Sequence, residues 1–343
     1  MTAIPDTCLE VRLKTRPDGV PNAENFKIVS VPLPIPRDGE VLVRNRYFLV
    51  SASLRMMISK GAEDVEGVPF PALREGDALA GEALGEIVSA PAGSGFSHGD
   101  LVLHFRGWRE YATVPIAQCR SVEPGLPDPV GYLGHGWTAY AALTRGVRIR
   151  PGDTVFVSSA AGAIGSMAGQ IARLLGAGRV IGSTSSKEKA ARLVSELGYD
   201  AAVFRGATPI VEQLAAAAPQ GIDVFIDNVG GEQLQAAIAN ARVGARVVIL
   251  GALSGQLAAH GPGRTAPVEL DSMQLLLKKI TLRGYSADDD PGVQAEWTRR
   301  FADWLGAGSI RFPHEIMTGL EWAPQTLERV INGKCFGTVV VKP

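Results

Sequence analysis

The sequence is poor in cysteine, has no excess of charge of either sign and contains no long hydrophobic run. Its three cysteines, Cys8, Cys119 and Cys335, lie far apart. No CxxC pair or disulfide framework is therefore readable, and a reduced, cytoplasmic setting is the simple interpretation. The N-terminus lacks a basic start followed by an apolar run, so we expect no signal peptide. The longest apolar stretch, residues 160–175, is interrupted by polar side chains and is too short to cross a bilayer.

Charge and composition narrow the class of protein further. Lys+Arg is 34 and Asp+Glu is 35, which gives a formal net charge of −1, so nothing indicates a nucleic acid or an anionic membrane as a partner. Hydrophobic residues make up 46% and charged residues 20% of the 343 positions, which excludes a disordered chain and favours two globular domains. The 40 glycines and 22 prolines follow no period, which excludes a collagen-like chain.

Three zones follow one another along the chain. In residues 1–129 short strand-like runs, such as 40–44 and 100–103, are broken by glycine and proline, which predicts an antiparallel barrel or sandwich. In residues 130–305 apolar strands alternate with helix-length segments, which predicts an α/β domain with a doubly wound parallel sheet. Residues 306–343 return to a helix and a terminal strand. We expect this tail to complete the first domain, so that the α/β domain is inserted between its two parts.

A glycine turn between a strand and a helix is the strongest local signal. Residues 154–158 read as a buried strand, the next residues are small, and a helix pattern begins at Ile164. Gly162 would let the backbone approach a pyrophosphate, and Gly165 would let the helix pack on the strand. The helix N-terminus would offer its N–H groups to the phosphates. Ala160 stands at the first glycine of G-x-G-x-x-G. The pattern predicts a dinucleotide site, and the alternative is a tight turn that binds no ligand.

The end of the second strand of this zone decides which dinucleotide is expected. NAD-binding sites carry an Asp or Glu there for the ribose 2′-OH, whereas here the strand ends in Gly182, Ser183 and Thr184, without a carboxylate. Lys189 on the following helix and Arg205 after the next strand can supply cations to a 2′-phosphate. These residues predict NADP(H), and the alternative is two solvated surface cations.

Short segments spread over almost the whole chain carry a family resemblance. The most specific is residues 227–231, which read D-N-V-G-G. The others are residues 23–26, 39–45, 107–111, 138–140, 160–165 and 337–342. With these segments in this order, the chain resembles the zinc-free group of the medium-chain dehydrogenase/reductase superfamily that includes prostaglandin reductases, leukotriene B4 12-hydroxydehydrogenases and alkenal double-bond reductases.

The resemblance implies a GroES-like β-barrel catalytic domain, formed by residues 1–129 and 306–343, with an inserted Rossmann domain of residues 130–305 that binds NADPH. It also implies a homodimer. The expected contacts run from the pyrophosphate through the 2′-phosphate, which Lys189 would bind, to the ribose and the nicotinamide. The expected cofactor residues are Thr138, Gly162, Ala163, Ile164, Gly165, Ser166, Ser183, Lys189, Arg205, Asn228, Gly251, Ala252, Leu253, Ser254, Tyr285, Ser286, Ala287 and Cys335.

Several positions depart from the family pattern. Arg205 stands where the family has Tyr near the 2′-phosphate, and Cys335 stands where it has Asn before the last Gly. In the expected substrate loops, residues 51–68 and 253–268, the family segments D-P-Y-M-R and I-S-Q-Y read S-A-S-L-R and L-S-G-Q, so two pocket tyrosines are lost. The cofactor side therefore matches the family, while the substrate side departs from it.

The sequence predicts chemistry without zinc. Gly81-Glu82 stands where zinc dehydrogenases of the superfamily carry G-H-E, and the histidines have no paired ligand spacing. Hydride transfer to the β-carbon of an enone or enal then needs a donor for the enolate oxygen and a proton for the α-carbon. The candidates for catalytic roles are Ser53, Arg55 and Tyr285. We expect an NADPH-dependent enone reductase that acts on an apolar small molecule. The alternatives are a quinone oxidoreductase and a non-catalytic NADP-binding protein.

Overall fold

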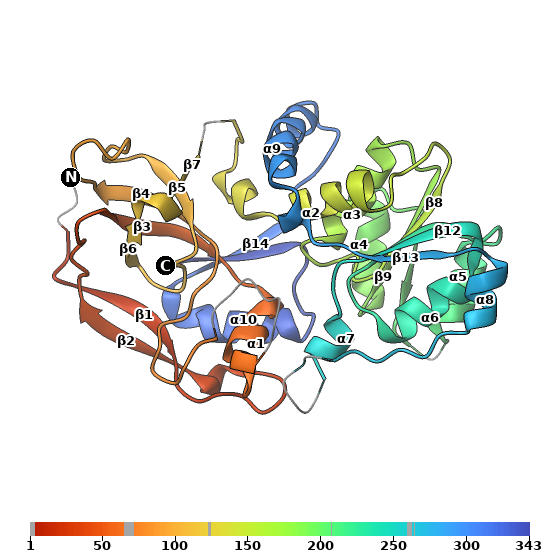
Figure 1. Cartoon of the computed structure of the whole chain (residues 1–343), viewed down its shortest axis with the longest axis horizontal. Coiled ribbons are helices and arrows are strands. Elements are labelled where there is room, and N and C mark those ends of the chain that lie inside the picture. Colours follow the sequence, from red (N-terminus) through yellow and green to blue (C-terminus); the bar gives the residue numbers. More distant parts are fainter. Residues whose placement is uncertain (1–3, 65–71, 123–124, 207, 259–262, 264) are drawn as a thin grey trace.

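The computed structural model describes residues 4–64, 72–122, 125–206, 208–258, 263 and 265–343. Two halves lie side by side in Figure 1. One carries the N-terminal strands together with the C-terminal strands, and the other carries a parallel sheet with its helices. Among the helices in the described ranges, none is long and apolar enough to cross a membrane. Of the expected substrate loops, residues 65–68, 259–262 and 264 lie outside the described ranges.

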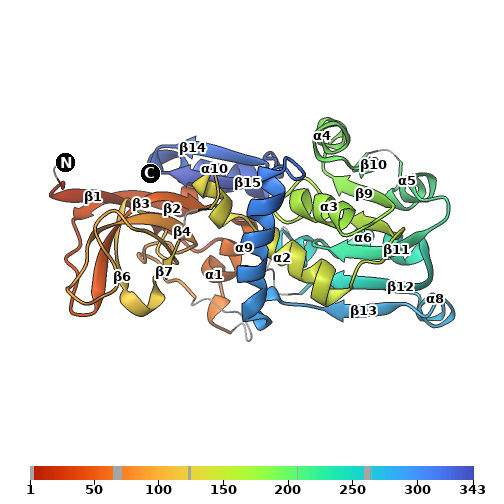
Figure 2. The same cartoon turned by 90° about the horizontal axis from the view of Figure 1, so that it is seen from above.

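A six-stranded parallel sheet occupies the middle part of the chain. Its strands are β8 (Thr154–Val157), β9 (Arg179–Thr184), β10 (Ala201–Phe204), β11 (Ile222–Asp227), β12 (Ala241–Ile249) and β13 (Thr281–Gly284). They follow one another in the order β10-β9-β8-β11-β12-β13, which leaves β13 as an outer strand (Figure 2). The direction of the chain across the sheet reverses between β8 and β11. Ligands of open α/β sheets bind at the carboxyl ends of the strands at such a switch point.

Helices cover both faces of this sheet because both faces of its strands are apolar. The helices of this half are α2 (Gly136–Ala141), α3 (Gly165–Leu174), α4 (Lys187–Leu197), α5 (Ile210–Ala217), α6 (Gly231–Ala239), α8 (Ser272–Leu277) and α9 (Pro291–Gly306). Val155 and Val157 of β8 lie in one buried cluster with Ile171 of α3. Phe156, which points the other way, lies in a second cluster with Leu214 of α5. This alternation confirms the α/β architecture with a Rossmann-like parallel sheet that the sequence predicts.

Most of the remaining strands lie in one sheet that joins the two ends of the chain. The strands of this half are β1 (Thr7–Leu13), β2 (Phe26–Pro32), β3 (Glu40–Leu49), β4 (Ala83–Ser89), β5 (Leu101–His104), β6 (Tyr111–Pro115), β7 (Arg120–Ser121), β14 (His314–Thr318) and β15 (Thr338–Lys342), and its helices are α1 (Arg55–Ile58) and α10 (Ala323–Ile331). The short helix α7 (Leu253–Gln256) follows β12 in the chain. The sheet path is β14-β15-β3-β4-β5-β7, with β6 paired to β3, while β1 and β2 pair separately. β15 runs antiparallel to β3, with Val340 opposite Leu49. Division of the chain at residues 129/130 and 305/306 stays a prediction.

The glycine turn after β8 lies directly against the C-terminal segment. Gly337 donates its N–H to the carbonyl oxygen of Ala161 at 2.8 Å, and Gly162 and Gly337 form an isolated parallel bridge. Gly337 has a φ of 81°, and an added Cβ there would lie 2.1 Å from the carbonyl oxygen of Pro313. This approach therefore requires glycine. The expected cofactor turn is held from the C-terminal side as well as by its own sheet.

Candidate cofactor and active site

The glycine turn opens α3 without a cap. An added Cβ at Gly165 would lie 2.3 Å from the carbonyl oxygen of Ser159, so glycine is needed for this helix to approach the end of β8. Ile164 stands at the N-cap position and no side chain caps the helix. The hydroxyl of Ser166 is buried and donates to the carbonyl oxygen of Ala163 at 3.4 Å. Ser166 and Met167 donate their N–H groups to the carbonyl oxygens of Gly162 and Ile164. Within the described ranges this leaves the N–H groups of residues 163–165 for an anion, as a pyrophosphate site requires.

Two cations and an uncharged strand tip meet at the end of β9. Ser183 is buried within the strand, and the tip itself, residues 182–186, has no carboxylate. Phe204 pairs with Thr184, which brings the next residue, the exposed Arg205, to the same edge. Lys189 lies half-buried in the first turn of α4. This arrangement fits a 2′-phosphate.

Lys189 also links α4 to the segment before β15. Its ammonium donates to the carbonyl oxygen of Gly333 at 2.7 Å and to that of Cys335. The Ser185 hydroxyl donates to the Gly333 oxygen at 3.3 Å. An ammonium group has three N–H donors, so the described residues use two of them and leave one for an anion. Burial raises the pKa of the Cys335 thiol to about 11, and Glu315 adds to the rise. At neutral pH the Cys335 thiol is therefore protonated, and the group that Lys189 contacts is its carbonyl oxygen.

The turn after β11 is built around a buried carboxyl group. Asp227 Oδ1 accepts hydrogen bonds from the Ser158 hydroxyl at 3.0 Å and from the N–H groups of Val229 and Gly230, both at 2.9 Å. Burial raises the pKa of Asp227, while these hydrogen bonds lower it. Asn228 donates its amide to the carbonyl oxygen of Ser158 at 2.8 Å. Its Oδ1 is buried and has no partner in the described part of the chain. This free acceptor fits a ribose hydroxyl.

The start of α7 and the two residues before it pack against this turn, so predicted cofactor residues from two segments come together. Leu253 donates its N–H to the carbonyl oxygen of Asn228 at 3.2 Å, and Ser254 donates to that of Val229 at 2.9 Å. An added Cβ at Gly251 would lie 3.0 Å from the Asn228 carbonyl oxygen. Residues 251–254 therefore line the carboxyl edge of β11, where the ribose and nicotinamide contacts are expected.

Tyr285 follows β13 directly. An added Cβ at Gly146 would lie 3.6 Å from its ring, so the ring packs on the π-helical turn that continues α2. Thr138 lies half-buried on α2. This helix packs against the short 3-10 helix that begins at Ala287. Ala287 is buried, whereas Ser286, the residue before it, is exposed. The Tyr285 hydroxyl is buried and has no partner among the described residues. Burial raises the pKa of Tyr285, so this hydroxyl stays a donor at neutral pH.

The other two predicted catalytic residues lie on the barrel side of α7. Ser53 Oγ lies 2.8 Å from Ser51 Oγ, so the two hydroxyls share a hydrogen bond. Arg55 is buried, and its guanidinium donates to the carbonyl oxygen of Gln256 and, at 2.9 Å, to that of Ala258. The sequence singled out Arg55 but not these partners. Catalytic roles for Ser53, Arg55 and Tyr285 stay predictions, as do the individual cofactor contacts.

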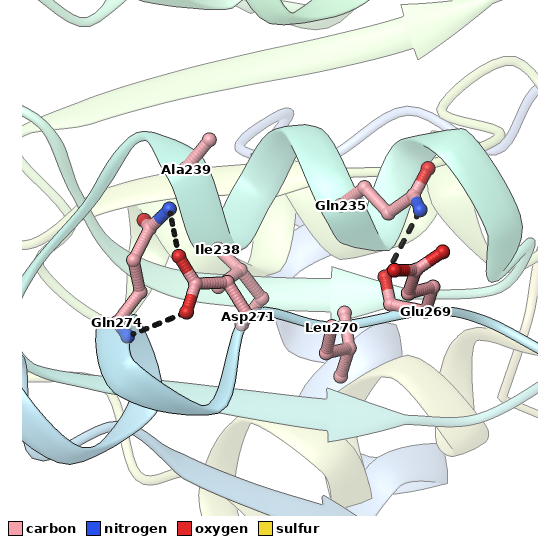
Figure 3. Close-up of a pocket in the computed structure, with 7 residues that line it drawn as sticks. All are labelled: Gln235, Ile238, Ala239, Glu269, Leu270, Asp271 and Gln274. Atoms are coloured by element: carbon pink, nitrogen blue, oxygen red, sulfur yellow. Dashed lines mark hydrogen bonds between the residues drawn. The ribbon is translucent and has the colours of Figure 1, made fainter.

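A separate cavity lies away from this site. A cavity of about 450 Å³ opens between α6 and the start of α8. There Gln235 donates to the carbonyl oxygen of Glu269, and Gln274 donates to the carboxylate of Asp271 (Figure 3). The residues that α6 contributes to this cavity lie in its second half, away from the carboxyl end of β11, so we assign the cavity no part in the cofactor site. Within the described ranges, no group of three His, Cys, Asp or Glu side chains could hold a metal ion.

Family models, curated relatives and solved structures all indicate the same family. Residues 10–122 match a family model described as the N-terminal domain of oxidoreductase, and residues 163–305 match one described as zinc-binding dehydrogenase. A putative NADP-dependent oxidoreductase of Bacillus subtilis, YfmJ, is 34% identical, with 97% of each chain covered. The NADPH-dependent curcumin reductase of Escherichia coli is 31% identical, with 96% of this chain and 95% of that protein covered.

A solved structure has the same fold over the whole length. The crystal structure of CurA in complex with NADPH from Vibrio vulnificus has a TM-score of 0.86 and 32% identity, with 97% of this chain and 98% of that chain covered. Other relatives are named prostaglandin reductase 1 and 2-alkenal reductase. The family resemblance predicted from the sequence is thereby confirmed. The chain belongs to the medium-chain dehydrogenase/reductase family, in the zinc-free group that contains the prostaglandin, alkenal and curcumin reductases.

Proposed function

We propose that this protein reduces the C=C bond of small, apolar α,β-unsaturated carbonyl compounds with NADPH. It is an NADP-dependent oxidoreductase of the medium-chain family, and NADP(H) is its cofactor. The observation that carries the proposal is the uncharged end of β9 with Lys189 and Arg205 beside it, which favours the phosphorylated dinucleotide. Relatives named for curcumin, prostaglandins, 2-alkenals and pulegone support the substrate class.

The chain would hold the cofactor along the carboxyl edge of the parallel sheet. We assign the 2′-phosphate to Lys189 and Arg205, and the pyrophosphate to the uncapped start of α3 at residues 163–166. A ribose hydroxyl would donate to the free Oδ1 of Asn228, and residues 251–254 would line the nicotinamide half. Each polar group of the cofactor would meet a protein group of opposite polarity, so the same contacts would both bind the cofactor and orient it.

The main contribution of the protein to this reaction is to position the substrate and the cofactor. When bound, NADPH supplies the hydride for the β-carbon of the substrate. The charge that develops on the carbonyl oxygen needs a hydrogen-bond donor, and the hydroxyls of Ser53 and Tyr285 are the neutral candidates for it. Water or a side chain returns a proton to the α-carbon. This division of work is typical of cofactor enzymes, in which the protein binds and orients the reactants.

A substrate panel tests the proposal. NADPH consumption is followed with cyclic enones, 2-alkenals, quinones and saturated aldehydes, together with a sample that has no acceptor. We expect oxidation with the enones and alkenals and none with the saturated aldehydes. Turnover of quinones alone would make the protein a quinone oxidoreductase, and tight NADPH binding without turnover of any acceptor would make it a non-catalytic binding protein.

We further propose that the protein is a cytoplasmic homodimer. Its free cysteines fit a reducing compartment. On α8, Met273, Leu276 and Leu277 are 58%, 69% and 67% exposed, beside β13, which pairs only with β12 in the described part of the chain. A second copy about a two-fold axis would cover this apolar surface and the open strand edge. In sedimentation velocity the double variant Leu276→Lys, Leu277→Lys should be monomeric, and the control Ile35→Lys should remain dimeric. A wild-type monomer would contradict the proposal.

A further inference from the structure

Arg55 joins the barrel half to a segment about two hundred positions later in the chain. It opens α1 and is 1% exposed. Its guanidinium donates from Nη1 to the carbonyl oxygen of Gln256 and from Nη2 to that of Ala258, the latter at 2.9 Å. Both carbonyls belong to the end of α7 and the residues just after it. The two hydrogen bonds therefore hold the backbone of this segment from the barrel side.

The same segment is anchored by two further contacts. Leu257, between the two carbonyls, packs against the buried apolar cluster of the barrel half that contains Leu54 and Met57. The side-chain amide of Gln256 lies 3.5 Å from the sulfur of Met56. An apolar side chain, an amide and two carbonyl oxygens thus dock residues 256–258 on the helix that carries Arg55.

The opposite end of α7 is attached to the cofactor edge of the parallel sheet. The N–H groups of Leu253 and Ser254 donate to the carbonyl oxygens of Asn228 and Val229 at 3.2 Å and 2.9 Å. The short helix therefore spans the space between the turn after β11 and Arg55. Any shift of residues 256–258 passes through a single turn of helix to residues 251–254, which are expected beside the nicotinamide.

We propose that Arg55 is a positioning residue that fixes the loop of residues 251–254 by binding the carbonyl oxygens of Gln256 and Ala258. It holds the loop at a fixed position relative to the barrel half. A substrate bound on the barrel side then faces the hydride donor at a fixed distance. The kinetic part of this inference rests on the proposed function. A misplacement of reacting groups by about 1 Å costs on the order of a hundredfold in rate, so a loosened loop lowers kcat before it lowers cofactor binding.

The test compares Arg55→Met and Arg55→Lys with a matched control. Arg109 is also a largely buried arginine that donates to main-chain oxygens, those of Leu79 and Gly107, but its contacts stay within the barrel half, so Arg109→Lys serves as the control. Hydrogen exchange reports on the loop without any substrate. We expect exchange of the amides of residues 253–258 to rise by about tenfold or more in Arg55→Met, to rise less in Arg55→Lys and to stay unchanged in the control.

Kinetics supply the second readout. In Arg55→Met we expect kcat with an enone to fall by about tenfold or more, while the Kd for NADPH changes by less than about threefold. The deuterium isotope effect with NADPH labelled at C4 should increase, because hydride transfer becomes more rate-limiting. Partial rescue is expected in Arg55→Lys, which is also the variant measured if Arg55→Met does not fold.

Unchanged exchange at residues 253–258 would overturn the inference. Faster exchange with wild-type kcat and isotope effect would also overturn it, because Arg55 would then only stabilise the fold. If the wild-type protein reduces no enone, the proposed function fails. The exchange measurement alone then decides whether Arg55 holds the loop.

Discussion

Removing Lys189 and Arg205, the two cations at the end of β9, should weaken the binding of NADPH relative to NADH. Lys189 is half-buried and has one N–H left for an anion after its bonds to Gly333 and Cys335. A hydrogen bond to a charged group contributes about 1.5–3 kcal/mol. The exposed Arg205 contributes less, about 0.5–1 kcal/mol. The sum, about 2–4 kcal/mol, corresponds to a rise in the Kd for NADPH of about thirtyfold to several hundredfold.

The assay is a fluorescence titration of each variant with NADPH and with NADH. Lys189→Met and Arg205→Met should each weaken NADPH binding, and the double variant should show the full loss, while NADH, which has no 2′-phosphate, stays within about threefold of wild type. The control Lys27→Met removes an exposed cation from β2 and should change neither titration. Because Lys189 also holds two carbonyl oxygens, urea unfolding is measured in parallel. An unchanged ratio of the two affinities in the double variant would refute the reasoning.

Three further predictions concern packing, pH and thiol chemistry. Gly165→Ala places a Cβ 2.3 Å from the carbonyl oxygen of Ser159. We therefore expect the free energy of unfolding, measured in urea, to fall by about 1–3 kcal/mol, and NADPH binding to weaken. Wild-type values for both quantities would contradict the close approach. Burial lowers the pKa of His104 to about 3, so as pH falls below the unfolded value of about 6.5 the unfolded chain takes up a proton that the folded chain does not. Wild type should lose about 2 kcal/mol between pH 7 and pH 5 that His104→Gln does not lose, and equal pH dependence in urea titrations would disprove this. Burial raises the pKa of all three thiols, so at pH 7 a disulfide reagent should label them slowly in the folded protein and fully in urea, whereas rapid labelling of the folded protein would show an exposed thiolate at Cys8, Cys119 or Cys335.

The glycine turn was predictable because its determinants are local. A buried strand, small residues, Gly162 and Gly165 and a helix follow one another within a dozen positions. The close approach that requires Gly165 is to Ser159 in the same stretch of sequence. The uncharged end of β9 was readable for the same reason, since the strand tip and the first turn of the next helix are adjacent in the chain.

Contacts made by main-chain atoms across large separations were not predictable. Arg55 binds carbonyl oxygens about two hundred positions away, and every residue offers the same carbonyl, so no residue type marks the partner. Lys189 likewise binds the carbonyls of Gly333 and Cys335. The role of Asp227 could have been predicted, since an Asp shortly before Gly-Gly favours a turn that is capped by its side chain. The catalytic roles of Ser53, Arg55 and Tyr285 stay predictions, since the pocket tyrosines of the family are absent here.

The most direct test of the central claim is the fate of deuterium delivered from NADPH labelled at C4. The product formed from an enone is isolated and its label located by NMR. We expect deuterium on the β-carbon of a saturated ketone or aldehyde. Deuterium on the carbonyl carbon of an unsaturated alcohol, or an unlabelled product, would contradict it.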